Sequence, residues 1–146
     1  MIQRIQSIYL LLAGITLGIS VYLPLASGSA TEGTVWADGS LAGFEGGTLG
    51  MVHGALLVAT TVIAILAIFL FNNRPVQTKL ANTSMVLAIL GLVTGYLSFS
   101  QNTGTTEGAA MQVGMFLPLA AVVLFILAGK AIKKDEKTVR SMDRLR

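Results

Sequence analysis

The chain has 146 residues, of which 53% are hydrophobic and 12% are charged, and its mean hydropathy is +0.75. Soluble domains carry about a quarter charged residues, so a chain this apolar has too little polar surface to cover a globule in water. The composition excludes an ordinary soluble domain and indicates a membrane protein of one domain. Because the chain has no cysteine, disulfides and cysteine-based metal or redox chemistry are also excluded.

Four apolar stretches are long enough to cross about 30 Å of hydrocarbon, which takes roughly 20 helical residues. In lipid, backbone polar groups must be paired within the segment, so each stretch is expected to be an α-helix. The first stretch is longer than the apolar core of a cleaved secretory signal, so we expect it to remain as a span. The predicted fold is an all-α, integral membrane four-helix bundle in a single domain, residues 1–146, with spans at about 5–25, 49–71, 80–99 and 113–132 and a tail at 133–146.

The ten lysine and arginine residues fall on one side of this four-span arrangement. Seven are in the last 17 residues, and the others are Arg4, Arg74 and Lys79. The linkers at 26–47 and 100–112 contain four acids and no base. Because bases near span ends stay in the cytoplasm, we expect both termini and the 72–79 loop to be cytoplasmic. The two acidic linkers then face the opposite side.

The linker at 26–47 is expected to form a small cap outside the cytoplasm. Its Asp38-Gly39 pair favours a tight hairpin turn. Trp36, the only tryptophan, is expected near the membrane interface. The acids of the two linkers match no metal-binding loop in their spacing, so they are expected to be solvated; they are Glu32, Asp38, Glu45 and Glu107.

Three spans carry two glycines four residues apart, and the fourth contains Pro118, which is expected to kink its helix. Helices in lipid associate where small residues let their backbones approach. The glycine pairs therefore predict helix packing, either inside one bundle or along a seam with a second copy or another protein. The pairs are Gly14/Gly18, Gly50/Gly54 and Gly91/Gly95.

His53 is the only histidine and lies about one turn into the second span. Ionisable groups inside a membrane are candidates for function. Haem in a bundle needs a second axial ligand, which only a dimer would supply here, and a proton relay needs a carboxylate that the spans lack. A hydrogen bond to a neighbouring helix is therefore the expected role, His53 remains a weak cofactor candidate, and no cofactor or metal is predicted.

The remaining polar side chains in the spans are mostly hydroxyls, which can bond the carbonyl of the preceding turn. They could also line a pore, although no ring of charge accompanies them. No phosphate-binding glycine loop and no set of nucleophile, base and orienting group can be assembled from the sequence. We therefore expect no catalytic residue and no enzyme.

The tail is expected to continue the fourth helix, with Ile132, Val139, Met142 and Leu145 forming a narrow apolar stripe. Three acids are interleaved with the bases along it. A thin stripe with mixed charge suits a protein partner better than a lipid surface. A solvated topology anchor and anionic lipid remain alternatives, whereas the acids disfavour nucleic acid. The candidate contact residues are Arg4, Lys133, Lys134, Lys137, Arg140, Arg144 and Arg146.

The two ends of the chain, "MIQRIQSIYLLLA" and "DEKTVRSMDRLR", resemble a bacterial family of short four-span proteins, number 4293 in the domain-of-unknown-function series. The resemblance covers the whole length and implies a bacterial inner-membrane protein. It implies no activity, cofactor or catalytic residue.

Together these features predict a small, non-catalytic accessory or structural subunit of a larger inner-membrane complex. It would contact other subunits through its helix faces and cytoplasmic ends. One alternative is a small oligomeric transporter or channel, and a second is a redox or haem-linked component that uses His53.

Overall fold

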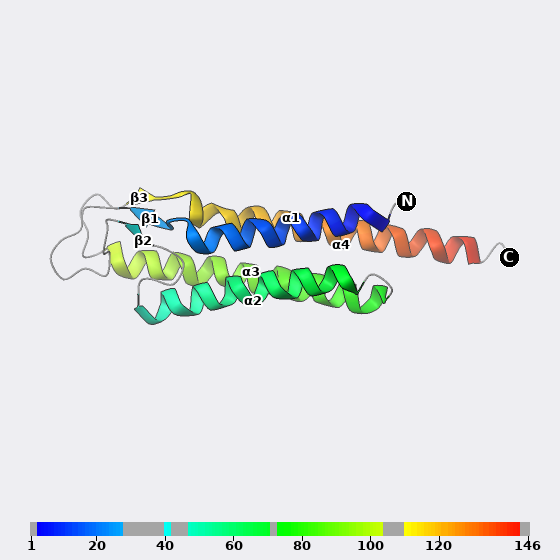
Figure 1. The fold of residues 1–146 in the computed structure, drawn as a ribbon, viewed down its shortest axis with the longest axis horizontal. Helices are drawn as coiled ribbons and strands as arrows, with labels where there is room; N and C mark the ends of the chain where they lie inside the picture. Colours follow the sequence, from blue (N-terminus) through cyan, green and yellow to red (C-terminus); the bar gives the residue numbers. More distant parts are fainter. Residues whose placement is uncertain (1–2, 28–39, 42–46, 71–72, 104–109, 144–146) are drawn as a thin grey trace.

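The computed structural model describes residues 3–27, 40–41, 47–70, 73–103 and 110–143. Within these residues, four helices lie side by side in an elongated bundle (Figure 1): α1 (Gln3–Tyr22), α2 (Gly47–Phe69), α3 (Arg74–Thr103) and α4 (Val113–Asp143). Each helix contains a stretch long and apolar enough to cross a membrane. The predicted all-α four-helix fold is confirmed, and the chain is a multi-pass membrane protein.

The helices form a closed ring in which each one contacts the helices before and after it, and α4 contacts α1. The pairs α1/α4 and α2/α3 share the most extensive interfaces and form the two layers of Figure 1. Consecutive helices run antiparallel, so the bundle has two chemically different ends. We call the end that carries the three short strands the strand end, and the end where α1 begins and α4 finishes the terminal end.

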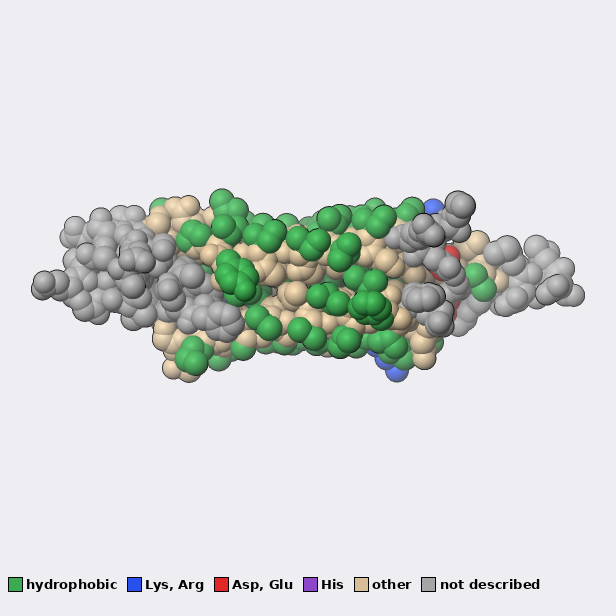
Figure 2. Space-filling view, viewed as in Figure 1, with side chains coloured by type: hydrophobic (Ala, Val, Ile, Leu, Met, Phe, Trp, Pro, Cys, Tyr) green, Lys and Arg blue, Asp and Glu red, His purple; other side chains and the backbone are tan. Residues whose placement is uncertain are grey.

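The described residues among the bases that the sequence placed on one side are together at the terminal end. Arg4 is in the first turn of α1, Arg74 and Lys79 are in the first turns of α3, and the lysines of α4 are in its C-terminal half. In Figure 2, the blue side chains lie at the border of the apolar belt visible on this face of the bundle. The four acids of the linkers lie outside the described residues.

Buried positions recur along the helices in alternating steps of three and four residues. An average period of 3.5 residues keeps one face of each helix against its neighbours when the helices coil around each other with a left-handed twist. The pattern extends through α3 from one end of the bundle to the other, where the buried residues are Gln77, Ala81, Ser84, Ala88, Gly91, Gly95 and Ser98.

Small residues fill much of this inward face, and large apolar residues point outward. On α3, for example, Val86, Leu90 and Val93 are exposed, whereas Ala81 and Ala88 are buried. In hydrocarbon, burying a large apolar side chain brings no hydrophobic gain, because the lipid is equally apolar. Close backbone approach is therefore the main source of packing energy, and small residues provide it.

A three-stranded sheet of two-residue strands covers part of the strand end. β1 (Ala26–Ser27) is central and pairs antiparallel with both β2 (Ser40–Leu41) and β3 (Ala110–Met111). The sheet joins the end of α1 to the segments that precede α2 and α4. The turn predicted at Asp38-Gly39 lies outside the described residues, as does Trp36. The adjoining residues of β2 pair with β1 of the same linker, and β3 joins them from the 100–112 linker, which is far away in sequence.

Pro118 explains a buried contact between α1 and α4 next to this sheet. Proline has no backbone N–H, so the carbonyl four residues earlier, that of Gly114, loses its donor within the helix. The hydroxyl of Ser20, which is 0% exposed, donates to that carbonyl at 2.9 Å. The Gly114 N–H in turn donates to the Pro24 carbonyl at 3.1 Å. The end of α1 and the start of α4 thereby complete each other's backbone hydrogen bonds.

We expect Gly114→Ala to destabilise the bundle by about 2 kcal/mol or more, because overpacking a tight contact usually costs that much. The added Cβ would lie 2.5 Å from the Pro24 carbonyl oxygen, which is backbone and cannot rotate away. Gly18→Ala is the matched control, since its Cβ would meet nothing closer than 4.0 Å. The measurement is the free energy of unfolding in mixed detergent micelles. Equal stability of the two variants would contradict the tight contact.

Candidate functional site

His53 lies on the buried face of α2, and its side chain is 0% exposed. Its Nδ1 is 2.7 Å from the carbonyl oxygen of Gly91 on α3. A carbonyl can only accept, so Nδ1 carries the hydrogen and donates it. The hydroxyl of Thr94 donates to the same oxygen at 2.9 Å. The structure therefore contains the interhelical hydrogen bond expected for this histidine.

The Gly91/Gly95 pair makes room for this contact. A Cβ on Gly95 would lie 2.9 Å from Cε1 of the His53 ring, and a Cβ on Gly91 would lie 3.1 Å from Cδ2 of Leu57. His53 and Leu57 are one turn apart on α2, so the two glycines of α3 receive two successive side chains of α2. This glycine motif packs helices inside the molecule.

The other predicted glycines also lie at internal interfaces or on buried faces. A Cβ on Gly14 would lie 3.8 Å from Cβ of Ala64 on α2, which is an ordinary contact. Gly18 of α1 faces Thr61, which is also on α2, and Gly50 and Gly54 are buried in α2. These glycines leave little exposed glycine surface for pairing with a second copy.

The surroundings of His53 do not fit a haem. In the tautomer fixed by Gly91, Nε2 is an acceptor, and it is buried with no hydrogen-bond partner among the described residues. The ring is fully covered and rests on Gly95, so a macrocycle would have to separate α2 from α3 to reach Nε2. Nothing in this packing favours a redox role.

A second group of buried polar side chains lies in the core near the terminal end. The sequence analysis did not predict most of these contacts. Gln6 of α1 donates through Nε2 to Oε1 of Gln77 on α3 at 3.3 Å, and both side chains are buried. Asp135 of α4, 8% exposed, also faces inward. Gln77 could have been found from its place in the three–four spacing of α3, but it lies before the segment predicted to span the membrane.

The tail differs from the predicted mixed-charge surface in one important respect. Ile132 is 0% exposed, so the apolar stripe that was expected to receive a partner begins inside the protein's own bundle. Asp135 is buried and Glu136 is half-buried on the same side of α4, whereas Lys133, Lys134 and Lys137 are exposed. Acids and bases alternate along the sequence, but they are separated around the helix.

The other predicted contact residues can be placed only in part. Arg4 and Arg140 lie on helical backbone at the terminal end, and Arg144 and Arg146 lie outside the described residues.

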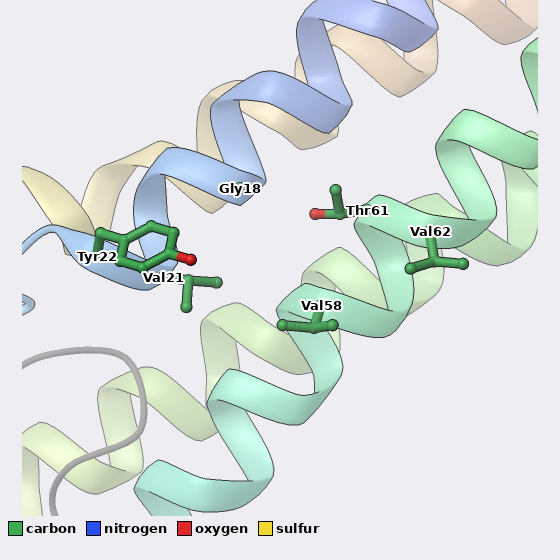
Figure 3. Close-up of a pocket in the computed structure, with 6 residues that line it drawn as sticks. All are labelled: Gly18, Val21, Tyr22, Val58, Thr61 and Val62. Carbon is green, nitrogen blue, oxygen red and sulfur yellow. The ribbon is translucent and has the colours of Figure 1, made fainter.

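A shallow groove opens between α1 and α2 towards the surrounding lipid (Figure 3). Its volume is about 160 Å³, and its lining is mostly apolar. The Thr61 hydroxyl, its central polar group, already donates to the Leu57 carbonyl at 2.9 Å. The groove therefore has the character of a lipid-facing surface depression. Its lining residues are Gly18, Val21, Tyr22, Val58, Thr61 and Val62.

A family model described as a domain of unknown function (DUF4293) matches residues 2–145. The chain belongs to this family. The resemblance noted at the two ends of the sequence is thus confirmed over nearly the whole length. Searches of curated proteins and of solved structures found no match. The family description supplies no activity for this DUF4293 protein.

We expect Gly95→Ala to destabilise the protein by about 1–3 kcal/mol, because the added methyl would overlap the buried His53 ring. Gly14→Ala should be close to neutral, since its Cβ has room. Adding His53→Ala to Gly95→Ala should recover part of the loss, because residues in direct contact are not additive. The free energies of unfolding of the three variants and of the parent give this cycle. Strictly additive effects would show that the ring and the glycine are not in contact.

Proposed function

We propose that this DUF4293 protein is a small, non-catalytic accessory or structural subunit of a larger bacterial inner-membrane complex. The observation that carries the proposal is the unequal length of paired helices. α1 and α4 are joined at the strand end, yet α1 has 20 residues and α4 has 31. The excess is about three helical turns, or about 16 Å. Figure 1 shows α4 continuing past the start of α1 at the terminal end.

This extension is suited to contact another protein. A helix of about ten residues would be marginal in water by itself, but as a continuation of α4 it is already nucleated. Its exposed face carries polar residues such as Thr138 and Ser141, and Val139 is half-buried. A bundle packed through small residues supplies an anchor for such an arm, and no catalytic constellation is present among the described residues.

The clustering of bases supports the proposed orientation. The start of α1, the end of α4 and the adjoining ends of α2 and α3 lie at the terminal end, where the described lysines and arginines are found. The positive-inside rule then makes this end cytoplasmic and the strand end extracytoplasmic.

The transporter alternative receives less support from the core. Large and small apolar side chains occupy its middle, including Leu10, Leu17, Leu57 and Phe125, all at most 2% exposed. The hydroxyl of Thr60 in this region is satisfied by the Leu56 carbonyl of its own helix. The polar layers at His53 and at Gln77 are thus separated by largely apolar packing, in which the hydroxyl of Ser84 is also buried.

Deletion of residues 138–146 tests the proposal while leaving the buried Asp135 in place. The variant should insert and remain helical, but membrane proteins that co-purify in stoichiometric amount with the parent should be lost. An exterior tag in the 100–112 linker keeps the arm free, and quantitative mass spectrometry is the readout. A variant in which residues 138–146 are replaced by an equally long Gly/Ser segment separates loss of the arm from a change in chain length. Undiminished recovery of the partners would count against the proposal.

The orientation has its own test, because the chain contains no native cysteine. Ser141→Cys on the arm and Ala110→Cys in β3 place single thiols at exposed positions on the two ends. In intact spheroplasts a membrane-impermeant maleimide should label Ala110→Cys and should reach Ser141→Cys only after permeabilisation. The reverse pattern would show the opposite orientation.

A further inference from the structure

Four lysines form a continuous stripe on the outer face of α4. Lys130, Lys133, Lys134 and Lys137 are separated by steps of three, one and three residues, so they fall on one side of a helix with 3.6 residues per turn. All four are exposed. We call this set the lysine stripe.

The lysine stripe directly continues the face of α4 that contacts lipid. Towards the strand end, the same side of the helix exposes Val123, Ile126 and Leu127. The opposite side, which includes Phe125 and Ile132, is buried against the bundle. The lysines therefore lie on the outside of the bundle, immediately beyond the last exposed apolar residue of this face.

Their depth matches the level of lipid headgroups. The headgroup region adds about 5–8 Å to each side of the hydrocarbon core. Lys130 comes three residues after Leu127, and Lys134 lies about 6 Å further along the helix axis. Lys137 is about 10 Å beyond Lys130, slightly outside that region.

The acids of this segment lie away from the centre of the stripe. Asp135 is buried on the other side of α4, and Glu136 is half-buried at the border of the stripe, one turn from Lys133. The exposed face consequently presents four positive charges in succession.

We propose that the lysine stripe is a binding surface for the headgroups of anionic phospholipids in the leaflet at the terminal end. The long apolar stems of the lysines lie along the helix beside the acyl chains, and their ammonium groups reach the phosphates. The inference concerns the side of α4 that faces lipid, so it does not depend on the proposed protein partner of residues 138–146.

Spin-labelled lipids give a direct test with the full-length protein. The protein is reconstituted in phosphatidylcholine bilayers that contain a trace of spin-labelled phosphatidylglycerol or spin-labelled phosphatidylcholine. Electron paramagnetic resonance then measures the fraction of each probe immobilised at the protein surface. We expect the parent to prefer phosphatidylglycerol by about tenfold at low salt, since each base near the surface can contribute up to about fivefold. The preference should fall as salt shortens the screening length.

Replacing all four lysines by glutamine should reduce the preference to about twofold or less, while the matched variant with four arginines should retain it. Circular dichroism and gel filtration check that both variants are folded. If the glutamine variant does not fold, the pair Lys133→Gln and Lys137→Gln, together with the salt dependence of the parent, decides the question.

Absence of a phosphatidylglycerol preference in the parent would overturn the proposal, as would a preference that survives in the folded glutamine variant. If the lysines instead prove necessary only for recovery of a protein partner, the stripe is a protein contact and the proposal is wrong.

Discussion

Hydrocarbon offers no hydrogen-bond partner, and this constraint decides how the polar residues of the chain are used. Pro118 removes a donor from α4, and the carbonyl that it frees at Gly114 is satisfied by Ser20 of the neighbouring helix. His53 donates to the carbonyl of Gly91, which stays accessible because both Gly91 and Gly95 lack a side chain. In each case a residue that would weaken an isolated helix becomes a specific link between two helices. The proline, the glycines and the histidine are thereby explained as parts of the fold.

The same constraint shapes the interior and limits what it can do. Because lipid and core are equally apolar, the bundle is stabilised by close approach and by a few polar contacts between helices. Among the described residues, the polar contacts between helices occur towards the two ends, with Gln6 and Gln77 at one and Ser20 and His53 at the other. Largely apolar packing lies between them, with Thr60 and Ser84 also buried there. Such an interior is suited to holding four helices in a fixed arrangement.

Hydropathy was sufficient to predict the four helices and their class, and the distribution of bases was sufficient to predict that both termini meet at one end. The inward faces of the helices were harder to predict. Inside a membrane both faces of a helix are apolar, so hydropathy does not distinguish them. Side-chain size does distinguish the two faces. However, the chain has 16 glycines, so small residues occur at four-residue spacing in several registers. The contact between Ser20 and the Gly114 carbonyl depends on the pairing of α1 with α4, which no local pattern specifies. The charge separation in the tail could have been predicted from the sequence, because the steps from Lys130 to Lys137 already place these lysines on one face.

At the terminal end, the lipid-facing side of α4 is proposed to bind lipid headgroups and the segment after Lys137 is proposed to bind a protein partner. An arm that emerges from a membrane can present residues to a partner only if its height above the bilayer is defined. Burial of Ile132 and Asp135 against the bundle fixes the rotation of α4, and this rotation turns the lysine stripe towards the lipid. Lysines bound to headgroup phosphates would then fix the depth of the helix, because moving them into hydrocarbon or away from the phosphates is unfavourable. Residues beyond Lys137 would be held at a constant distance from the membrane surface. In this arrangement lipid binding and partner binding use successive segments of one helix, so the charge of the leaflet would influence how the arm is presented without any movement inside the bundle.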